Sequence, residues 1–302
     1  MLTSELYNYF EKSNSVSTDS RSIKKGSIFF ALKGDNFDGN KFAEKAIKDG
    51  ASYAVVDDHT LNHSQYIKVD NVLKSLQSLS KFHRSKLLKT KIIALTGSNG
   101  KTTTKDLIAA ALAPSKRVVA NIRSFNNEQG LPVTILNAPI TTEVLVLEMG
   151  MRGHGQIADL CRIARPAIGV ITRVGQAHTE LLGGLAGVAE AKGELIEALP
   201  PQGMAILNAD DSLVMAMSAR SSAPVMTYGE SASADVHISA VTIDQQGCAA
   251  FVIRTPSGSC AMKLSIAGRH MAHNAAAAIA VGESLGVSLD SMAMALSMTT
   301  IS

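Results

Sequence analysis

The stretch Lys91–Lys105, KIIALTGSNGKTTTK, constrains the fold of this chain more than any other segment. Its apolar run Ile92–Leu95 is typical of a short buried parallel strand. Thr96–Gly100 follows as a glycine-bearing turn, and Lys101–Leu112 lacks Gly and Pro and is rich in helix formers. The order of strand, glycine turn, Lys-Thr and helix predicts a phosphate-binding loop, although an ordinary strand-to-helix turn shares this layout.

The predicted loop is shorter than the common Walker pattern, because Leu95 stands where that pattern has its first glycine. Backbone N–H groups in the turn and at the helix N-terminus would face the phosphates. Lys101 would reach the terminal phosphates, and the hydroxyl of Thr102 would ligate Mg²⁺. The residues expected to bind the nucleotide are Gly97, Ser98, Asn99, Gly100, Lys101, Thr102 and Thr103.

The chain has 302 residues, which is enough for two domains, and its patterns alternate between strands and helices. Strands are expected at 27–32, 52–56, 66–69, 118–120, 143–148, 166–172, 203–208 and 224–228, and helices at 41–49, 72–88, 188–199 and 270–285. Alternating segments at 236–243, 248–254 and 261–266 predict antiparallel strands, and 125–132 reads as a polar loop. The predicted class is α/β, with a small N-terminal domain (1–88) and a central phosphate-loop domain (89–302). The central domain combines a mostly parallel sheet with an antiparallel appendage.

Three side chains are candidates because of their position. Glu148 ends a predicted strand beside the loop, where a Walker-B-type Mg²⁺ ligand sits, and a solvated strand-end Glu is the alternative. His178 comes just after the next predicted strand, at the active edge of a doubly wound sheet, although a lone His is more often structural. Lys192 is isolated in a lysine-poor region, and a surface lysine is its ordinary interpretation.

Composition excludes several classes of function. A net charge of +3 is too small to indicate nucleic-acid binding by itself. Three cysteines without metal-ligand spacing indicate free thiols in a reducing compartment. No apolar run is long enough to span a membrane, and the charged N-terminus lacks the apolar core of a signal peptide. We therefore expect a cytoplasmic protein that neither binds nucleic acid nor inserts into a membrane.

Lysine and arginine are unevenly distributed along the chain. Sixteen of the eighteen lysines lie at or before Lys116, and nine of the eleven arginines lie after it. The change falls inside the nucleotide domain, so we hypothesise a junction between two homologous genes near Leu112–Lys116. Ordinary variation of composition is the alternative.

Seven motifs together resemble the Mur ligases of peptidoglycan synthesis, and the resemblance covers essentially the whole chain. They are Asp19-Ser-Arg21, Gly97–Thr102, Asn126-Asn127, Glu148, Ala177-His178, Ala191–Glu194 and Gly268-Arg-His270. The Asn126-Asn127 loop resembles the branch that joins D-alanyl-D-alanine to UDP-N-acetylmuramoyl-tripeptide. Relatives that add diaminopimelate or lysine usually show Thr-Thr-Pro there. The resemblance implies an ATP-dependent, ADP-forming ligase in which the peptide carboxylate becomes an acyl phosphate that the amine of D-alanyl-D-alanine attacks.

The resemblance also implies roles for single residues. Thr102 and Glu148 would hold a first Mg²⁺, while His178 and Lys192 would serve a second. Lys192 would act as a carbamate formed with CO₂, an oxygen donor of the kind that Mg²⁺ prefers. Lys101, His178 and Lys192 are thus the implied catalytic residues, and Asn274 would contact adenine. The residues implied to bind the UDP-linked substrate are Ser20, Arg21, Asp38, Gly39, Asn40, Asn126 and Asn127.

Two departures from the family pattern stand out. Met271 replaces the first Asn of the family's His-Asn-x-x-Asn motif, which would weaken adenine binding. Family members also carry a third, C-terminal domain, and the chain stops where that domain should start, so we expect the chain alone to bind nucleotide but to ligate negligibly. The alternatives are a ligase that adds diaminopimelate or lysine, folylpolyglutamate synthase, and a non-catalytic nucleotide- or UDP-binding module.

Overall fold

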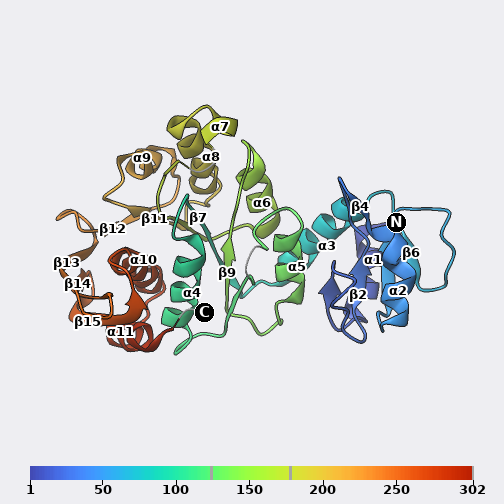
Figure 1. Cartoon of the computed structure of the whole chain (residues 1–302), viewed down its shortest axis with the longest axis horizontal. Helices are drawn as coiled ribbons and strands as arrows, with labels where there is room; N and C mark the ends of the chain where they lie inside the picture. Colours follow the sequence, from blue (N-terminus) through green and yellow to red (C-terminus); the bar gives the residue numbers. More distant parts are fainter. Residues whose placement is uncertain (123–124, 177–178, 301–302) are drawn as a thin grey trace. The chain divides into compact units, whose positions relative to one another are not determined.

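The computed structural model describes residues 1–122, 125–176 and 179–300, and it divides the chain into two units. The first unit comprises Met1–Leu88 and Glu128–Ile140, and the second comprises Lys89–Asn127 and Thr141–Ser302 (Figure 1). A short stretch from the middle of the chain therefore packs with the N-terminal residues.

The first unit is built on a sheet of four parallel strands in the order β1-β2-β5-β6. Its elements are α1 (Thr3–Glu11), β1 (Val16–Ser17), β2 (Ile28–Phe30), β3 (Lys33–Gly34), β4 (Phe37–Asp38), η1 (Gly39–Phe42), α2 (Ala43–Lys48), β5 (Tyr53–Val56), β6 (Tyr66–Lys68), α3 (Val72–Lys86) and α5 (Gly130–Asn137). Side chains of a strand alternate between faces, so Ile28 and Phe30 pack with α1, α3 and α5, while Phe29 packs with α2. Because the four strands are parallel, their carboxyl ends lie on the same side of the sheet. The candidate polar residues of this unit follow these ends.

The second unit contains one sheet of nine strands in the order β15-β14-β13-β12-β11-β10-β7-β9-β8. Its elements up to β11 are β7 (Lys91–Thr96), α4 (Lys101–Leu112), β8 (Val118–Ala120), β9 (Val144–Glu148), α6 (Gln156–Ala164), β10 (Ile168–Ile171), α7 (Thr179–Leu182), α8 (Leu185–Glu197) and β11 (Met204–Asn208). The elements that follow are α9 (Ser212–Met215), η2 (Ala216–Arg220), β12 (Val225–Gly229), β13 (Val236–Ile243), β14 (Cys248–Thr255), β15 (Gly258–Ala267), α10 (Met271–Ser284) and α11 (Leu289–Met298). The proposed gene junction lies in the turn between α4 and β8.

The topology of this sheet places the turn after β7, the predicted phosphate-binding loop, at a switch point. Strands β8 to β12 run parallel, and β7 lies between β9 on one side and β10 on the other. The chain leaves β7 toward β8 and β9 and later returns to β10 on the far side of β7. In open α/β sheets, ligands bind outside the carboxyl ends of the strands at such a point. The turn after β7 therefore occupies the position at which this architecture binds ligands.

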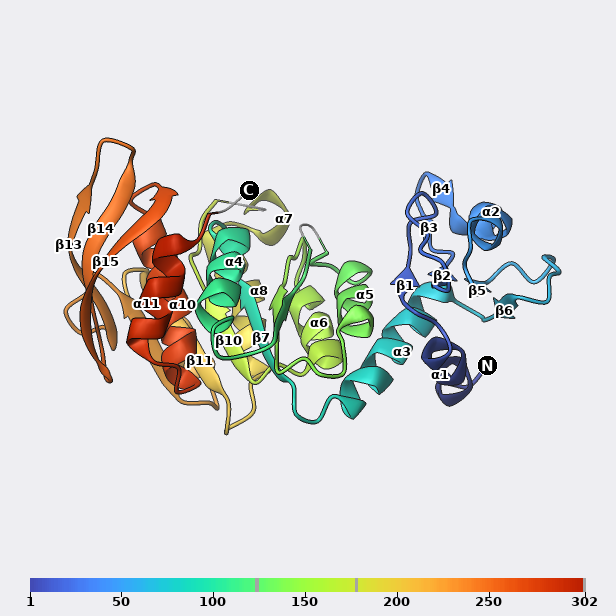
Figure 2. The same ribbon diagram turned by 90° about the horizontal axis from the view of Figure 1, so that it is seen from below.

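Helices cover both faces of the nine-stranded sheet. Ile93 and Leu95 face a cluster formed with α4, α10 and α11, whose alanines allow close packing. On the other face α8 packs on β7 and β10, and Leu195 and Leu199 lie against Gly169 of β10. Figure 2 shows α4, α10 and α11 on one side of this unit. Double coverage explains why the strand that leads to the loop is apolar at consecutive positions.

The α/β class predicted from the sequence is confirmed, with one refinement. The antiparallel strands are continuous with the parallel ones, because β13 pairs parallel with β12 and antiparallel with β14. Helices α1, α5, α6, α7 and α9 were not predicted from the sequence, and α5 includes Pro132, which was assigned to a polar loop. Pro132 is the third residue of α5, and the first turn of a helix tolerates proline. No helix among the described residues is long and apolar enough to cross a membrane.

Candidate functional site

The turn after β7 is fixed by contacts with the segment that follows β10. The N–H of Ser98 donates to the carbonyl of Arg173 at 2.7 Å, and its hydroxyl accepts the N–H of Gly175 at 2.8 Å. Thr172 Oγ1 donates to the carbonyl of Asn99 at 2.8 Å. A Cβ at Gly97 would collide with this same Thr172 oxygen, so the close approach requires glycine. The predicted loop is therefore held rigidly at the carboxyl edge of the sheet.

Lys101 begins helix α4 at the end of this turn. Gly100 caps the helix in the left-handed conformation, with φ of 80°, which favours glycine. The Lys101 ammonium donates to the carbonyls of Gly97 and Ser98, at 2.9 and 3.3 Å. The same region therefore holds a cation and the unpaired N–H groups of a 12-residue helix, and both attract phosphate.

Thr102 and Glu148 meet beside the loop. The Thr102 hydroxyl donates to Glu148 Oε2 at 2.8 Å, and the side-chain amide of Asn126 donates to Glu148 Oε1 at 2.9 Å. Glu148 is 3% exposed although it ends a strand, so its interpretation as a solvated strand-end Glu is wrong. A hydroxyl and a buried carboxylate are the oxygen donors that Mg²⁺ prefers, and the pair fits such an ion. No group of three His, Cys, Asp or Glu side chains suited to a metal occurs among residues 1–122, 125–176 and 179–300.

Lys192 is a buried cation on α8. Only 3% of the residue is exposed, so its interpretation as a surface lysine is wrong. Burial, and in second place the charge of Lys101, lower the pKa of the Lys192 ammonium to about 8. The two lysines thus lie close enough to repel one another. An amine with such a pKa is unprotonated far more often near neutral pH than an ordinary lysine.

Asn274 lies on α10 against the N-terminus of α4. Its side chain is adjacent to Gly100, where an added Cβ would meet Asn274 Oδ1 at 3.0 Å. Its amide nitrogen contacts the sulfur of Met271 at 3.7 Å. Residue 271, at which the family motif has Asn, is therefore in direct contact with the candidate adenine-binding side chain.

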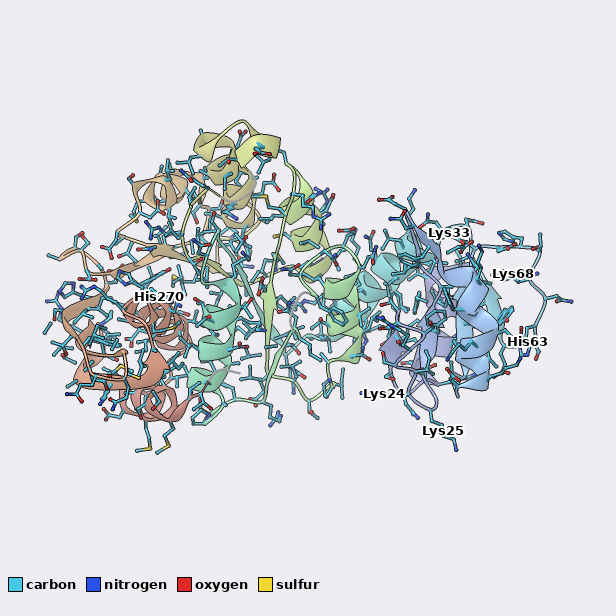
Figure 3. The ribbon with its side chains drawn as sticks, in the orientation of Figure 1. Lys24, Lys25, Lys33, His63, Lys68 and His270 are labelled. Atoms are coloured by element: carbon cyan, nitrogen blue, oxygen red, sulfur yellow. The ribbon has the colours of Figure 1, made fainter. Side chains whose placement is uncertain are left out.

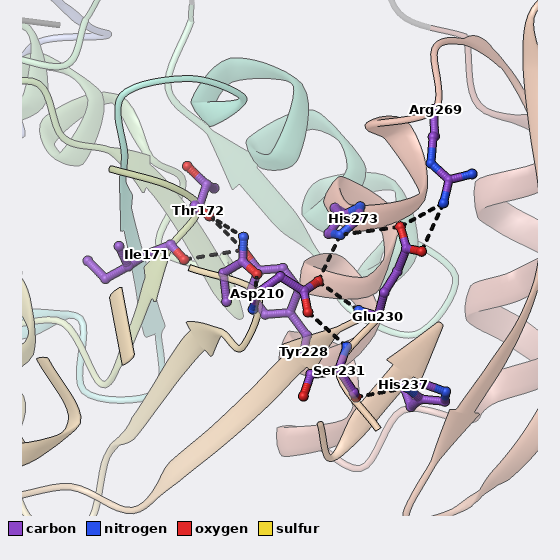
Figure 4. A network of polar contacts seen from close by, with 10 residues as sticks. Ile171, Thr172, Asp210, Tyr228, Glu230, Ser231, His237, Arg269 and His273 are labelled. Carbon is purple, nitrogen blue, oxygen red and sulfur yellow. Dashed lines mark hydrogen bonds and ion pairs between the residues drawn. The ribbon is translucent and has the colours of Figure 1, made fainter. Parts of the chain in front are cut away.

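A polar network fixes the start of α10. Asp210 accepts hydrogen bonds from the backbone N–H groups of Glu230 and Ser231 and contacts the His273 ring at 2.9 Å (Figure 4). Arg269 forms an ion pair with Glu230, in which Nη2 donates to both carboxylate oxygens, at 2.8 and 3.0 Å. These contacts join the ends of β11 and β12 to the helix that carries Asn274.

Some candidate residues stand apart from this group. Ala177 and His178 lie outside the described residues, so the roles of His178 remain predictions. Asn127 follows Asn126 in the chain, and Thr103 lies in the first turn of α4.

Two residues near this site, Asn121 and Lys105, were not predicted from the sequence. The side chain of Asn121 accepts the N–H of Glu148 at 2.8 Å. The only sequence signal was a polar residue directly after a strand.

Five candidates for the UDP-linked substrate lie at the carboxyl end of the parallel sheet in the first unit: Ser20, Arg21, Asp38, Gly39 and Asn40. The other two, Asn126 and Asn127, belong to the second unit, where Asn126 bonds Glu148. Ser20 and Arg21 follow β1, and the exposed Arg21 guanidinium is paired with Asp19 at 2.8 Å. Arg21 hydrogen bonds, from the side chain first and from the backbone second, lower the pKa of Asp19 to about 2. Lys33, after β2, pairs with Asp57 at 2.9 Å, whereas Lys24 and Lys25 precede β2 (Figure 3).

Asn40 organises the second part of this edge. Its side-chain amide donates to Asp38 and Asp57, at 2.8 and 2.9 Å, and its oxygen accepts the backbone N–H of Asp57 at 3.1 Å. A Cβ at Gly39 would collide with the carbonyl of Leu32, so only glycine fits at this position. Segments after β2, β4 and β5 are thus tied together at one place.

Two family models match this chain. The Mur ligase middle domain matches residues 95–282, and the Mur ligase family, catalytic domain, matches residues 12–92. The chain is 39% identical to a UDP-N-acetylmuramoyl-tripeptide--D-alanyl-D-alanine ligase of Bacillus subtilis, over 93% of this chain and 61% of that protein. It is 33% identical to the Escherichia coli protein of the same name, over 92% and 62%. The chain thus spans about six tenths of the length of these relatives.

Solved structures show the same similarity. The MurF structure from Acinetobacter baumannii superposes with a TM-score of 0.89 and 29% identity, covering 99% of this chain and 68% of that one. The MurF ligase from Thermotoga maritima in complex with ADP gives a TM-score of 0.84 and 27% identity, covering 97% and 67%. The similarity therefore extends over both units of this chain.

Proposed function

The chain belongs to the Mur ligase family, and from this premise we propose that it is an ATP-dependent ligase of peptidoglycan synthesis. Its substrates are UDP-N-acetylmuramoyl-tripeptide and D-alanyl-D-alanine, as in the names of its relatives. The observation that carries the proposal is the pairing of Thr102 with Glu148 beside Lys101, at a helix N-terminus. This arrangement offers oxygen donors for Mg²⁺ next to N–H groups and a cation for phosphates.

The reaction proceeds in two transfers. The terminal carboxylate of the tripeptide attacks the γ-phosphorus of ATP, and ADP leaves, which gives an acyl phosphate. The amine of D-alanyl-D-alanine then attacks the acyl carbon, the C–O bond breaks, and inorganic phosphate leaves as the nitrogen loses a proton. Lys101 and the N–H groups of the loop bind the phosphates, while Thr102 and Glu148 would hold Mg²⁺, which would neutralise phosphate charge.

Lys192 serves this site as a carbamate. Its unprotonated amine attacks CO₂ to give an anionic carbamate and a proton, and the low pKa caused by burial favours this form of the amine. The product changes a buried cation beside Lys101 into an anion, so repulsion between the two side chains becomes attraction. The carbamate oxygens would supply a further ligand for Mg²⁺, and we propose His178 as the second residue that would serve this ion.

The first unit binds the UDP part of the substrate. Arg21 and the N–H groups near Ser20 contact the diphosphate, and Asp38, Gly39 and Asn40 contact the sugar. The hydrogen bonds that hold Asn40 support this assignment because they fix its amide in one orientation. Asn274 contacts adenine in the second unit, and the Met271 sulfur at its side limits the polar contacts available there.

The test is phosphate release from ATP by the protein that carries this chain. Release should require UDP-N-acetylmuramoyl-tripeptide and D-alanyl-D-alanine together, and Lys192→Ala or Lys192→Arg should lower the rate at least about hundredfold. A short carboxylic acid should partly restore Lys192→Ala by filling the place of the carbamate. Release that ignores either substrate, or full activity of Lys192→Arg, would contradict the proposal.

A further inference from the structure

Asn121 connects three parts of the phosphate site. It is 1% exposed and follows β8, where its backbone N–H still donates to the carbonyl of Val146 at 3.1 Å. Its side-chain oxygen accepts the backbone N–H of Glu148 at 2.8 Å. Its side-chain amide donates to the carbonyl of Phe125 at 3.1 Å. One buried amide thus bonds to the strand that carries the carboxylate and to the residue that precedes Asn126.

Beyond the end of β8, the Asn121 side chain continues the hydrogen bonding between β8 and β9. β8 ends at Ala120, and beyond that point the oxygen of Asn121 takes the N–H that a further backbone carbonyl would take. The chain can therefore leave the sheet while the N–H of Glu148 stays bonded. Because buried N–H groups need partners, the last residue of β9 depends on Asn121 for its place.

Lys105 anchors Asn121 to the helix of the phosphate loop. It is 4% exposed, and its ammonium donates to the carbonyl of Asn121 at 2.9 Å and pairs with Asp106 at 3.2 Å. It lies three residues after Thr102, which places both side chains on the same side of α4. Thr102 bonds the Glu148 carboxylate directly, and Lys105 bonds the residue that holds the Glu148 backbone.

We propose that Asn121 is a positioning residue for the Mg²⁺ site, with Lys105 as its anchor. It fixes the backbone of Glu148 and the start of the Asn126 segment, so that the carboxylate faces Thr102 with both oxygens oriented. This inference rests on the proposed function, because it takes Glu148 as a Mg²⁺ ligand. Neither Asn121 nor Lys105 contacts the metal or the nucleotide in this assignment. Residues that orient metal ligands commonly change metal affinity about 10- to 100-fold when they are replaced.

The test is calorimetric titration of ADP into the protein at a series of Mg²⁺ concentrations. The measured quantity is the Mg²⁺ concentration at which half of the Mg²⁺-dependent gain in ADP affinity is reached. Asn121→Ala removes both side-chain bonds and should raise this concentration about tenfold or more. Lys105→Met leaves both side-chain bonds of Asn121 in place and removes the ammonium that bonds the Asn121 carbonyl and pairs with Asp106. It should raise this concentration less, and it keeps the inference testable if Asn121→Ala does not fold. ADP affinity measured in EDTA should remain that of the wild type in both variants, because the loop itself is unchanged.

Two matched controls come from the first unit. Asn137 also bridges backbone groups, since its side chain bonds the N–H and the carbonyl of Val16 at 2.8 and 2.9 Å. Lys68 also donates to a backbone carbonyl, that of His59, at 3.1 Å. Asn137→Ala and Lys68→Met remove the same kinds of bonds away from the loop. We expect their Mg²⁺ dependence to equal that of the wild type.

Glu148→Gln separates this inference from the function on which it rests. If Glu148→Gln raises the Mg²⁺ requirement while folded Asn121→Ala and Lys105→Met do not, the positioning role is wrong and the metal assignment stands. If Glu148→Gln leaves the requirement unchanged, the metal assignment fails and the inference fails with it. An equal shift in the two controls would also overturn the inference, because it would reflect general destabilisation.

Discussion

In the second unit, Lys101 and Lys192 form no ion pair with any carboxylate of the described residues, and Lys192 is buried. In the first unit, Arg21 and Lys33 are each paired with an aspartate at a partly exposed edge. Both regions are assigned to phosphate-bearing ligands. In the second unit Lys101 and Lys192 are thus without an anionic partner among the described residues, whereas Arg21 and Lys33 of the first unit are held in ion pairs.

This difference indicates that the two regions hold their cations at different free-energy cost before an anionic ligand binds. A buried ammonium without a carboxylate raises the free energy of the folded state, and an incoming phosphate or a carbamate relieves that cost. An exposed pair such as Arg21–Asp19 costs little and contributes little, but the arginine must exchange its aspartate for phosphate when substrate binds. We therefore expect the bound ligand to stabilise the folded state of the second unit more than that of the first.

The largest expected effect concerns Lys192, whose pKa of about 8 lies below the 10.5 of a free lysine. Between these pH values the unfolded chain binds the proton that the folded chain has lost, so stability rises from pH 8 to pH 10.5. Lys192→Met should thus stabilise the fold by up to about 3 kcal/mol at pH 7, and the gain should disappear near pH 10.5. Denaturant unfolding in CO₂-free buffer measures this effect.

The control for that experiment is Lys33→Met, which removes an exposed paired cation. It should lower the free energy of unfolding only slightly, because an exposed ion pair contributes little. Equal effects of the two substitutions would remove the distinction between the two regions.

The second prediction concerns ligand binding at the paired edge. Arg21→Ala should weaken binding of UDP-N-acetylmuramoyl-tripeptide about tenfold, because one charge-assisted contact to the diphosphate is lost. Titration calorimetry measures the change, and Lys25→Ala is the matched control because Lys25 lies before β2, at the opposite edge (Figure 3). A larger loss in Lys25→Ala than in Arg21→Ala would move the site away from the assigned edge.

The smallest expected effect is the pH dependence of the Arg21–Asp19 pair. The pKa of Asp19 is lowered to about 2 from 3.8, so the pair contributes stability above pH 4 and loses it as pH falls toward 2. The pair is exposed, and screening by solvent keeps its contribution to the free energy of unfolding small. Asp19→Asn should therefore weaken the dependence of the free energy of unfolding on pH between pH 4 and pH 2. An unchanged slope would show that the pair is not populated in solution.

The sequence was informative where function is local. The turn Gly97–Thr102 carries its chemistry in consecutive residues, so its strand, its helix and the roles of Lys101 and Thr102 could be predicted together. Glu148 was identified by its position at a strand end. Asn121 was not, because its importance comes from the pairing of β8 with β9 and from Lys105 on another element. Helix α5 was missed because Pro132 resembles a helix breaker, while packing against the core of the first unit stabilises the helix.

The most direct test of the account is calorimetric titration of Mg·ATP into the wild type, Lys101→Ala and Arg21→Ala. We propose that nucleotide binds at the loop after β7, where Lys101 supplies the cation for the terminal phosphates. We therefore expect Lys101→Ala to lose at least about 100-fold in affinity, equal to about 3 kcal/mol, and Arg21→Ala to keep the affinity of the wild type. Wild-type affinity in a folded Lys101→Ala variant would contradict the central claim.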